Sequence, residues 1–381
     1  MKKNYFYSAL VAGCLVIAAP VLAQKNYKII HATSETVDIR DGRNYFREVW
    51  SIAPHIKPDV YLTQQKKTKV TFITDQDSLS FMVKPKQVIN FNIVLNGKDT
   101  AWTQIKYEPS YLSKLTAAKK YNFSDHRFIP KFTYQSPNAP ELVALRSGLH
   151  LDSIAGTGSE LSKILNLLHW IHALIPHDGN HENPVVKNAL HMIAVCKQEQ
   201  RGLNCRGLAT VLNECYLALG IKSRFITCMP KDSIFNDCHV INLVWASELN
   251  KWIWIDPTND AYVMDENGLL LSPEEVRDRL IRKRPLILNP DANWNRKMSV
   301  TKEDYLYHYM AKNLYRIECP VVSEYDTESW QNGKKLTYVE LLPLDAFAQT
   351  PQYSEFTNKK LGVTFINYKT NNPSLFWEKP E

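Results

Sequence analysis

Three residues have the side chains that nucleophilic acyl chemistry requires, and they occur in a suitable order. Cys205 lies in RGLNCRGLATVLNECYLALG, His239 lies in DCHVINLVW, and Asp256 ends the run KWIWID. This chemistry needs a thiolate, an imidazole that takes and returns its proton, and a carboxylate that holds the imidazole. Each of the three residues stands at the end of a predicted element, where side chains from separate segments can converge. We therefore predict that Cys205 is a nucleophile.

A helix and three short strands must position these residues. One apolar stripe runs along the segment behind Cys205, and Gly220 follows where helices commonly end. The stripe consists of Leu208, Val211, Leu212, Cys215 and Leu219. Strands are predicted at 223–229, 239–245 and 251–256, with residues 247–250 as a link of hairpin length. The positive end of the helix dipole would favour the thiolate of Cys205, and backbone N–H groups there could bind an oxyanion.

Helical patterns precede and follow this region. Apolar spacing predicts a helix that begins after Ser159 and stops near Pro176, and a second from about 184 to 196. Ser272 followed by Pro273 marks another helix start, and a further helix is expected over 302–315. The tail segments 335–343 and 362–368 are β-like. Helices followed by an antiparallel sheet indicate an α+β catalytic domain.

Residues 27–107 alternate apolar and polar side chains, and Asn96-Gly97 is a turn signal, so this part is predicted to be β-rich. We expect four divisions of the chain. They are a signal peptide at 1–23, a β-rich N-terminal domain at 24–115, a catalytic domain at 116–300, and a C-terminal helix and strands at 301–381 that pack on the core.

Each of the supporting residues has an ordinary structural explanation as well. A histidine on an apolar strand face, such as His239, is commonly a buried residue with its hydrogen bonds satisfied, and a carboxylate before proline, such as Asp256, commonly caps a turn. Their combination with a cysteine at a helix start favours the catalytic interpretation. Asn204, Gln198 and Gln200 are candidates for oxyanion or substrate binding, and the sequence does not choose among them.

The stretch from about Ser159 to Asp260 resembles the catalytic core of the transglutaminase-like superfamily, a branch of the papain-like cysteine enzymes. The shared features are G-x-N-C with a helix behind it, GIKSRF after that helix, CHVIN on a strand, and WIWIDPT at the end of the next. By this resemblance Cys205 is the nucleophile, His239 the general base and acid, and Asp256 the residue that orients the imidazole. The resemblance implies a papain/transglutaminase-like core of helices and antiparallel sheet.

Active members of this superfamily share a thioester intermediate and differ in the nucleophile that resolves it. An amine gives cross-linking and water gives hydrolysis. Because the sequence carries no recognisable amine-binding feature, we expect hydrolysis of an amide or peptide bond, with a protein or peptide substrate that could be cell-wall or glycan-linked. The alternatives are a protein cross-linking transglutaminase and a non-catalytic binding module that retains the fold.

Charge and histidine spacing argue against two other classes of function. The net charge is +7, and the basic clusters at 66–69 and 282–284 lack interleaved aromatic residues, so we expect solvated faces and no nucleic-acid partner. Four histidines lie close in sequence, without an acidic residue between the first two. They are His169, His172, His177 and His181. Packing or a wall of the substrate site explains them better than a metal site, and no cofactor is expected.

The N-terminus has the features of a secretion signal. Lys2 and Lys3 precede an apolar stretch, and Ala23 suits cleavage before Gln24. The stretch continues past Cys14, which disfavours a lipid anchor at that cysteine. No other apolar run approaches the length needed to span a bilayer. We therefore expect an exported protein, periplasmic or secreted, with a disulfide between Cys228 and Cys238 left open.

Overall fold

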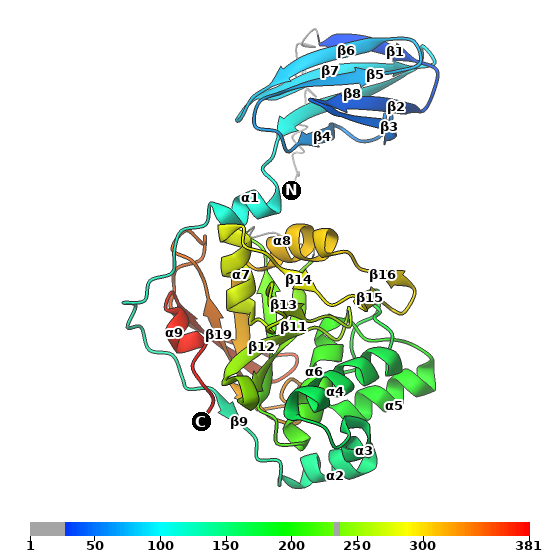
Figure 1. Ribbon diagram of the computed structural model, residues 1–381. Helices are drawn as coiled ribbons and strands as arrows, with labels where there is room; N and C mark the ends of the chain where they lie inside the picture. The colour runs from blue at the N-terminus through cyan, green and yellow to red at the C-terminus, as the bar shows by residue number, and fades with distance from the viewer. Residues whose placement is uncertain (1–26, 232–236) are drawn as a thin grey trace, which may run out of the picture. The chain divides into compact units, whose positions relative to one another are not determined.

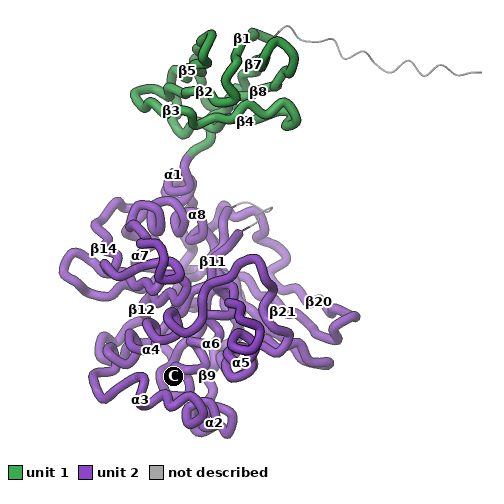
Figure 2. Tube along the Cα trace, turned by 90° about the vertical axis from the view of Figure 1, so that its right-hand side faces the viewer, with its two compact units in different colours: residues 1–109 green, residues 110–381 purple. Residues whose placement is uncertain are grey.

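The computed structural model describes residues 27–231 and 237–381, and the chain divides into two compact units, residues 1–109 and 110–381 (Figure 2). The signal segment expected at 1–23 lies outside the described residues. No helix in the described ranges combines the length and the apolar character that crossing a membrane would require.

The first unit consists of two four-stranded sheets that pack face to face, as expected for a β-rich N-terminal region (Figure 1). One sheet has the order β1 (Lys28–Ala32), β7 (Val88–Leu95), β8 (Asp99–Tyr107), β4 (Asp59–Thr63). The other has the order β3 (Asn44–Ser51), β2 (Thr36–Asp41), β5 (Thr68–Ile73), β6 (Ser78–Val83). Alternate residues of both sheets fill the space between them, where the rings of Phe72 and Phe91 lie 4.9 Å apart. Asn96 and Gly97 both have positive φ in the turn from β7 to β8.

The second unit is built on a seven-stranded sheet. Its order is β12 (Lys251–Ile255), β11 (His239–Ala246), β10 (Ser223–Met229), β17 (Arg316–Pro320), β19 (Lys335–Leu341), β21 (Val363–Thr370), β20 (Tyr353–Asn358). All neighbours are antiparallel except β19 and β21. Strands from the segment 301–381 therefore continue the sheet that β10 to β12 begin. Short two-stranded pieces complete the unit: β9 (Thr133–Tyr134), β13 (Val263–Met264), β14 (Ile287–Leu288), β15 (Asn293–Trp294), β16 (Met298–Ser299), β18 (Val322–Ser323).

Helices cover both faces of this sheet (Figure 1). One group packs on the face that carries Val244, Ile253 and Ile255. It consists of α2 (Pro140–Gly148), α3 (Leu151–Ala155), α4 (Glu160–Leu174), α5 (Ala189–Glu199) and α6 (Cys205–Ala218). The other group comprises α1 (Tyr111–Thr116), α7 (Pro273–Arg282), a π-helical segment (Glu303–Met310), α8 (Ala311–Asn313) and α9 (Pro373–Phe376).

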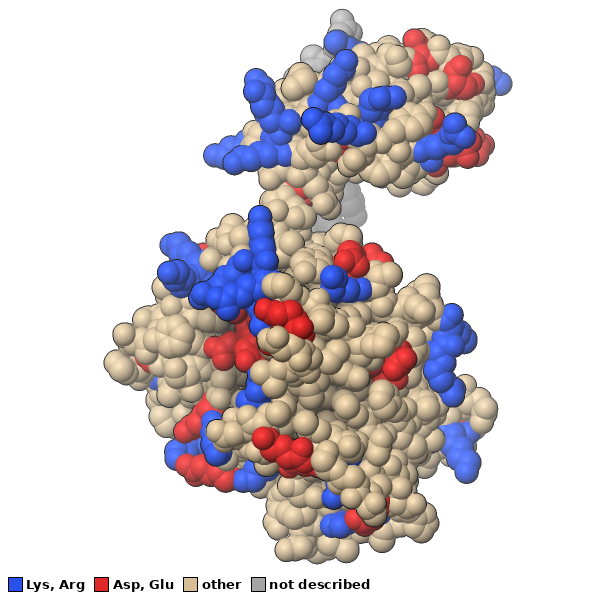
Figure 3. Space-filling view, viewed as in Figure 1, with Lys and Arg blue, Asp and Glu red and all other residues tan. Residues whose placement is uncertain are grey.

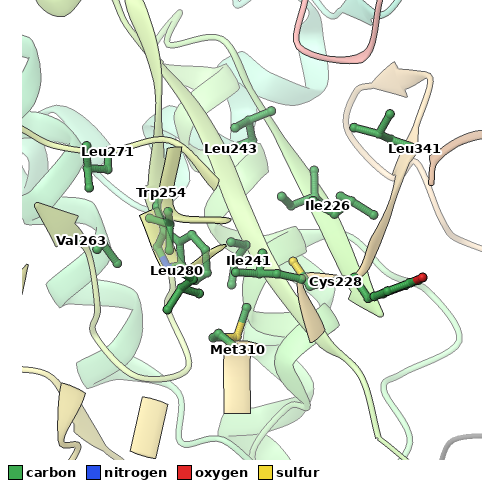
Figure 4. Close-up of a cluster of buried hydrophobic side chains, with 14 of the residues drawn as sticks. Ile226, Cys228, Ile241, Leu243, Trp254, Val263, Leu271, Leu280, Met310 and Leu341 are labelled. Atoms are coloured by element: carbon green, nitrogen blue, oxygen red, sulfur yellow. The ribbon is translucent and has the colours of Figure 1, made fainter. Parts of the chain in front are cut away.

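The alternation of strand residues explains the two layers. On β12, Trp252 and Trp254 face one hydrophobic cluster while Ile253 and Ile255 face the other. Figure 4 shows the first of these clusters, in which Trp254 lies near Leu280 of α7. Burial on both faces accounts for the nearly continuous apolar runs of β10, β11 and β12.

Most of the predicted elements of this unit are present. Ser159 caps α4, and Ser272 forms a capping box with Glu275 at the start of α7. The helix expected from about 184 begins later, at Ala189, because Asn188 caps it. The segment 302–315 is not one regular α-helix, since Glu303–Met310 is π-helical before α8 begins.

The surface charges of the second unit are mixed in sign. On the face drawn in Figure 3, acidic side chains lie among the basic ones. Arg282, from the basic cluster at 282–284, is exposed and pairs with Asp278 at 2.7 Å. This pairing is typical of a solvated face. The six cysteines of the described ranges are free, so Cys228 and Cys238 do not form a disulfide in this structure.

Candidate active site

Cys205 is the first residue of helix α6, and the preceding residue caps that helix. The side-chain oxygen of Asn204 accepts the N–H groups of Arg206 at 3.1 Å and Gly207 at 3.2 Å. These two bonds satisfy donors that the first turn of a helix leaves without intrahelical partners. Cys205 is partly exposed and packs against Val240. The sulfur therefore lies at the positive end of the helix dipole, within reach of β11.

The strand register brings His239 and Asp256 together. Asn242 of β11 pairs with Ile255 of β12, so Asp256, the next residue, lies beside Ile241. His239 is two residues before Ile241 and therefore has its side chain on the same face of the sheet. The ring Nε2 of His239 lies 2.7 Å from Oδ2 of Asp256. Both side chains are almost fully buried, with 2% and 0% of their surfaces exposed.

Three further donors hold the Asp256 carboxylate. Its Oδ1 accepts the backbone N–H of Thr258 at 2.9 Å. Its Oδ2 accepts the Asn259 amide at 3.0 Å and the Tyr305 hydroxyl at 2.5 Å. Burial alone would raise the pKa of Asp256, but the charge of His239 and these hydrogen bonds hold that pKa below its ordinary value. The carboxylate is therefore kept ionised where it faces the imidazole.

The thiol of Cys205 receives hydrogen bonds from two histidine rings. Burial alone would raise its pKa, but hydrogen bonds with His177 and His239, the charge of His239 and a backbone hydrogen bond from Val240 lower it to about 6. Because Asp256 occupies Nε2 of His239, the ring nitrogen left for the sulfur is Nδ1. At neutral pH these interactions favour a thiolate.

The pKa of His239 moves in the opposite direction. Burial disfavours the charged ring, but the Asp256 carboxylate and the Cys205 sulfur outweigh burial and raise the pKa of His239 to about 10. The ring of Tyr309 lies edge-on to the imidazole with centroids 5.2 Å apart, which limits its rotation. A thiolate and an imidazolium are therefore the stable pair across the neutral range. This is the resting state of a cysteine nucleophile.

One family model matches the part of the chain that contains these residues. Residues 149–257 match the family model described as the transglutaminase-like superfamily. This part of the chain is a transglutaminase-like domain. It contains Cys205, His239 and Asp256 and has the expected α+β fold, in which helices α3 to α6 precede strands β10 to β12 in the sequence.

Solved structures give only distant likenesses. A candidate cysteine protease from Cytophaga hutchinsonii is 21% identical, with a TM-score of 0.25, over 34% of this chain and 40% of that one. A red sea bream transglutaminase is 13% identical, with a TM-score of 0.20, over 61% of this chain and 49% of that one. The chain thus spans less than half the length of either protein. Among curated proteins, none matches this sequence.

Arg206, the residue after Cys205, ties the transglutaminase-like domain to the strands that follow it. The guanidinium of Arg206 contacts Glu328 at 2.5 Å and Thr227 of β10 at 2.7 Å. Glu328 is itself buried and accepts the Tyr338 hydroxyl of β19 at 2.8 Å. This network fixes the start of α6 against the sheet on which His239 lies.

The three residues considered for oxyanion or substrate binding lie in different surroundings. The Oδ1 atom of Asn204 is occupied as a helix cap and also accepts the Asn183 amide at 2.7 Å. Gln198 and Gln200 are exposed at the end of α5, and the Gln200 amide donates to the Lys197 carbonyl at 2.7 Å. None of these contacts involves the sulfur.

The four clustered histidines of the transglutaminase-like domain have separate partners. His169 binds Asp260 at 2.7 Å, and His181 binds Asp178 at 2.6 Å. The buried His172 contacts the Pro257 carbonyl at 3.0 Å, and His177 contacts the thiol. Within 27–231 and 237–381, no group of histidine, cysteine and carboxylate side chains could hold a metal ion.

Sequence reasoning did not assign a partner role to Asn259, Tyr305 or His177, which contact Asp256 or Cys205. Asn259 follows the WIWIDP run closely, so a polar side chain there could have been chosen as a partner of Asp256. Tyr305 gives no such signal, because it lies among other aromatic residues and 49 positions from Asp256. His177 was considered only as one of four clustered histidines, for which packing or a wall of the substrate site was preferred to a metal site.

The structure also explains Gly202 of the G-x-N-C motif. Leu203 and His177 form a parallel bridge in which Leu203 donates to the Pro176 carbonyl at 3.1 Å and accepts from Asp178 at 2.8 Å. A Cβ atom on Gly202 would lie 2.1 Å from that Pro176 oxygen. The glycine is therefore needed for the close approach of the His177 segment.

Proposed function

We propose that this protein is an exported cysteine-dependent acyl-transfer enzyme that hydrolyses an amide or peptide bond through a thioester on Cys205. The observation that carries the proposal is the thiol of Cys205 hydrogen-bonded to His239, whose far nitrogen binds a buried carboxylate. A nucleophile, a base and an orienting acid in this arrangement are the parts that thioester chemistry needs.

The first half of the reaction forms the thioester. The Cys205 sulfur bonds to the carbonyl carbon, and the π electron pair moves onto the oxygen. When the tetrahedral intermediate collapses, the C–N bond breaks and the His239 imidazolium gives its proton to the departing amine. Asp256 holds the ring in the orientation that this transfer requires, because it binds Nε2 and leaves Nδ1 toward the sulfur.

The second half returns the enzyme to its starting state. Water attacks the thioester carbon while the neutral His239 accepts one of its protons, and the C–S bond then breaks. The acid product leaves, and the thiolate and imidazolium are restored. An amine in place of water would give cross-linking. The features in support of hydrolysis are the partly exposed Cys205 and the absence, from the sequence, of a recognisable amine-binding feature.

The proposal is tested by trapping the acyl-enzyme. The full chain is mixed with a peptide library and quenched in acid, and the adduct on the Cys205 peptide is identified by mass spectrometry. We expect an acyl adduct on Cys205 in the native chain and in Cys196→Ala, a substitution of another cysteine of the same domain, and none in Cys205→Ala. A folded native chain that forms no adduct and releases no product from any peptide would contradict the proposal and favour a binding module. Products joined to added amines would favour the cross-linking alternative.

A further inference from the structure

A second histidine touches the nucleophile, and the group behind it differs from the group behind His239. His177 hydrogen-bonds with the Cys205 thiol. Its ring Nδ1 lies 3.4 Å from the indole Nε1 of Trp294, on the β15–β16 hairpin. An indole N–H can only donate, so Nδ1 of His177 must accept. The proton of the neutral ring then lies on Nε2, the nitrogen left for the sulfur side.

This arrangement directs an N–H of His177, and not a lone pair, toward the sulfur. A ring protonated on both nitrogens would direct its Nδ1–H at the Trp294 N–H, and no lone pair would remain between them. His239 has the opposite environment, because a carboxylate stabilises its charged form. The two rings beside the sulfur therefore have different roles. The Asp256 carboxylate behind His239 stabilises a charged ring, and the Trp294 indole behind His177 leaves that ring to donate its Nε2–H.

The His177 segment is held at several points. The side-chain amide of Asn295 accepts the His177 N–H at 2.6 Å and donates to the His177 carbonyl at 2.9 Å. The bridge with Leu203 fixes the same residue to the segment that leads into Cys205. A donor fixed in this way costs little reorganisation when charge develops next to it, which is the condition for electrostatic catalysis.

We propose that His177 is the side-chain donor that stabilises the oxyanion of the tetrahedral intermediate, with Trp294 as the positioning residue that sets its tautomer. As the Cys205 sulfur bonds to the carbonyl carbon, the electron pair that moves onto oxygen is met by the His177 Nε2–H. The Cys205 N–H is the second donor, because the Asn204 side chain uses the next two N–H groups and not this one. This inference rests on the proposed acyl transfer and deepens it.

The test compares two reactions of the same sulfur in the full chain. Acylation by p-nitrophenyl acetate passes through an oxyanion, and alkylation by iodoacetamide does not. Both rates are measured at pH 8, well above the thiol pKa of about 6. In His177→Ala we expect the acylation rate to fall about 10²-fold or more, the scale of losing one oxyanion donor. The alkylation rate should change less than about threefold, since the thiolate is already formed.

Replacement residues provide the matched variants. In His177→Gln the amide nitrogen lies as many bonds from Cβ as the histidine Nε2, so we expect acylation within about tenfold of the native rate. In His177→Asn the amide nitrogen lies one bond closer to Cβ, so we expect acylation as slow as in His177→Ala. Trp294→Phe keeps an aromatic ring but removes the indole N–H, and it should lower acylation by about tenfold without changing alkylation. His191→Ala, which removes an exposed ring from α5, should change neither rate.

Two outcomes would overturn the inference while leaving the proposed function in place. One is a His177→Ala protein that acylates Cys205 as fast as the native chain. The other is a parallel loss of acylation and alkylation in both His177→Ala and His177→Gln, which would indicate a structural role. A native chain that is alkylated at Cys205 but never acylated by the ester would instead contradict the acyl-transfer function, and the inference with it.

Discussion

The Tyr305 hydroxyl donates to Oδ2 of Asp256 at 2.5 Å, the same oxygen that His239 binds at 2.7 Å. Tyr305 comes from the π-helical segment Glu303–Met310, and its hydroxyl also accepts the Trp254 indole N–H at 3.1 Å. A buried carboxylate without such donors would be protonated or expelled toward water. The segment after the transglutaminase-like domain therefore supplies a hydrogen bond that helps to keep Asp256 ionised.

Substitution of Tyr305 by Phe should destabilise the protein at neutral pH by about 1.5–3 kcal/mol, because a buried charge loses one hydrogen-bond donor. The pKa of Asp256 is depressed in the folded protein. Its ionised form therefore stabilises the protein above the ordinary Asp pKa of about 4, and this stabilisation is lost as the pH falls from that value toward the lower pKa of the folded state. The difference between variant and native protein should therefore shrink in acid. Urea unfolding at pH 7 and at about pH 3, below the ordinary Asp pKa, measures it.

Tyr309→Phe is the matched control for that experiment. Among the described residues, the contacts of the Tyr309 hydroxyl are long, at 3.3 Å to Asp237 and 3.4 Å to the Cys238 carbonyl, and its ring remains against His239 in the variant. We expect a loss below about 1 kcal/mol for this variant. Equal losses for both tyrosines would show that the Tyr305 hydroxyl has no particular role at Asp256.

Asp256→Asn should preserve the side-chain shape and remove the charge that raises the pKa of His239. The imidazolium then loses its counter-ion, and the thiol pKa should rise toward its ordinary range. We expect turnover of the peptide substrate identified by acyl-enzyme trapping to fall by about 10³-fold or more, on the scale of carboxylate loss in other triads. Steady-state kinetics check this expectation, with circular dichroism to verify folding. A variant with near-native turnover would remove Asp256 from the mechanism.

The central residues could be predicted because their signals are local. A cap before Cys205, a stripe behind it, and two strands joined by a short link determine where Cys205, His239 and Asp256 fall. The residues that complete the site depend on contacts distant in sequence. Trp294 lies 117 positions from His177, and Tyr305 lies 49 from Asp256. No periodicity records such pairs, so the sequence left the oxyanion donor open among asparagine and glutamine residues.

Gly202→Ala should test how closely the His177 segment must approach the segment before Cys205. The added Cβ would meet the Pro176 carbonyl oxygen at 2.1 Å and Cβ of Asp178 at 2.9 Å, so backbone must move. We expect destabilisation of about 1–3 kcal/mol and slower acylation of Cys205 by p-nitrophenyl acetate.

Gly148→Ala serves as the control, since its nearest neighbour would be a Leu190 methyl carbon at 3.9 Å. This variant should remain within about 1 kcal/mol of the native stability. The two variants are compared by urea unfolding and by the acylation rate. If both behave alike, the tight contact at Gly202 has no consequence for the site.

The pH dependence of Cys205 alkylation tests most directly whether the sulfur is held as a thiolate. The full chain is treated with iodoacetamide from pH 4 to pH 9, and labelling of the Cys205 peptide is followed by mass spectrometry. The thiol pKa of about 6 and the His239 pKa of about 10 predict a rate that rises with a midpoint near pH 6 and then stays level to pH 9. A midpoint at the ordinary thiol value of about 8.5, or a cysteine inert at every pH, would contradict the account.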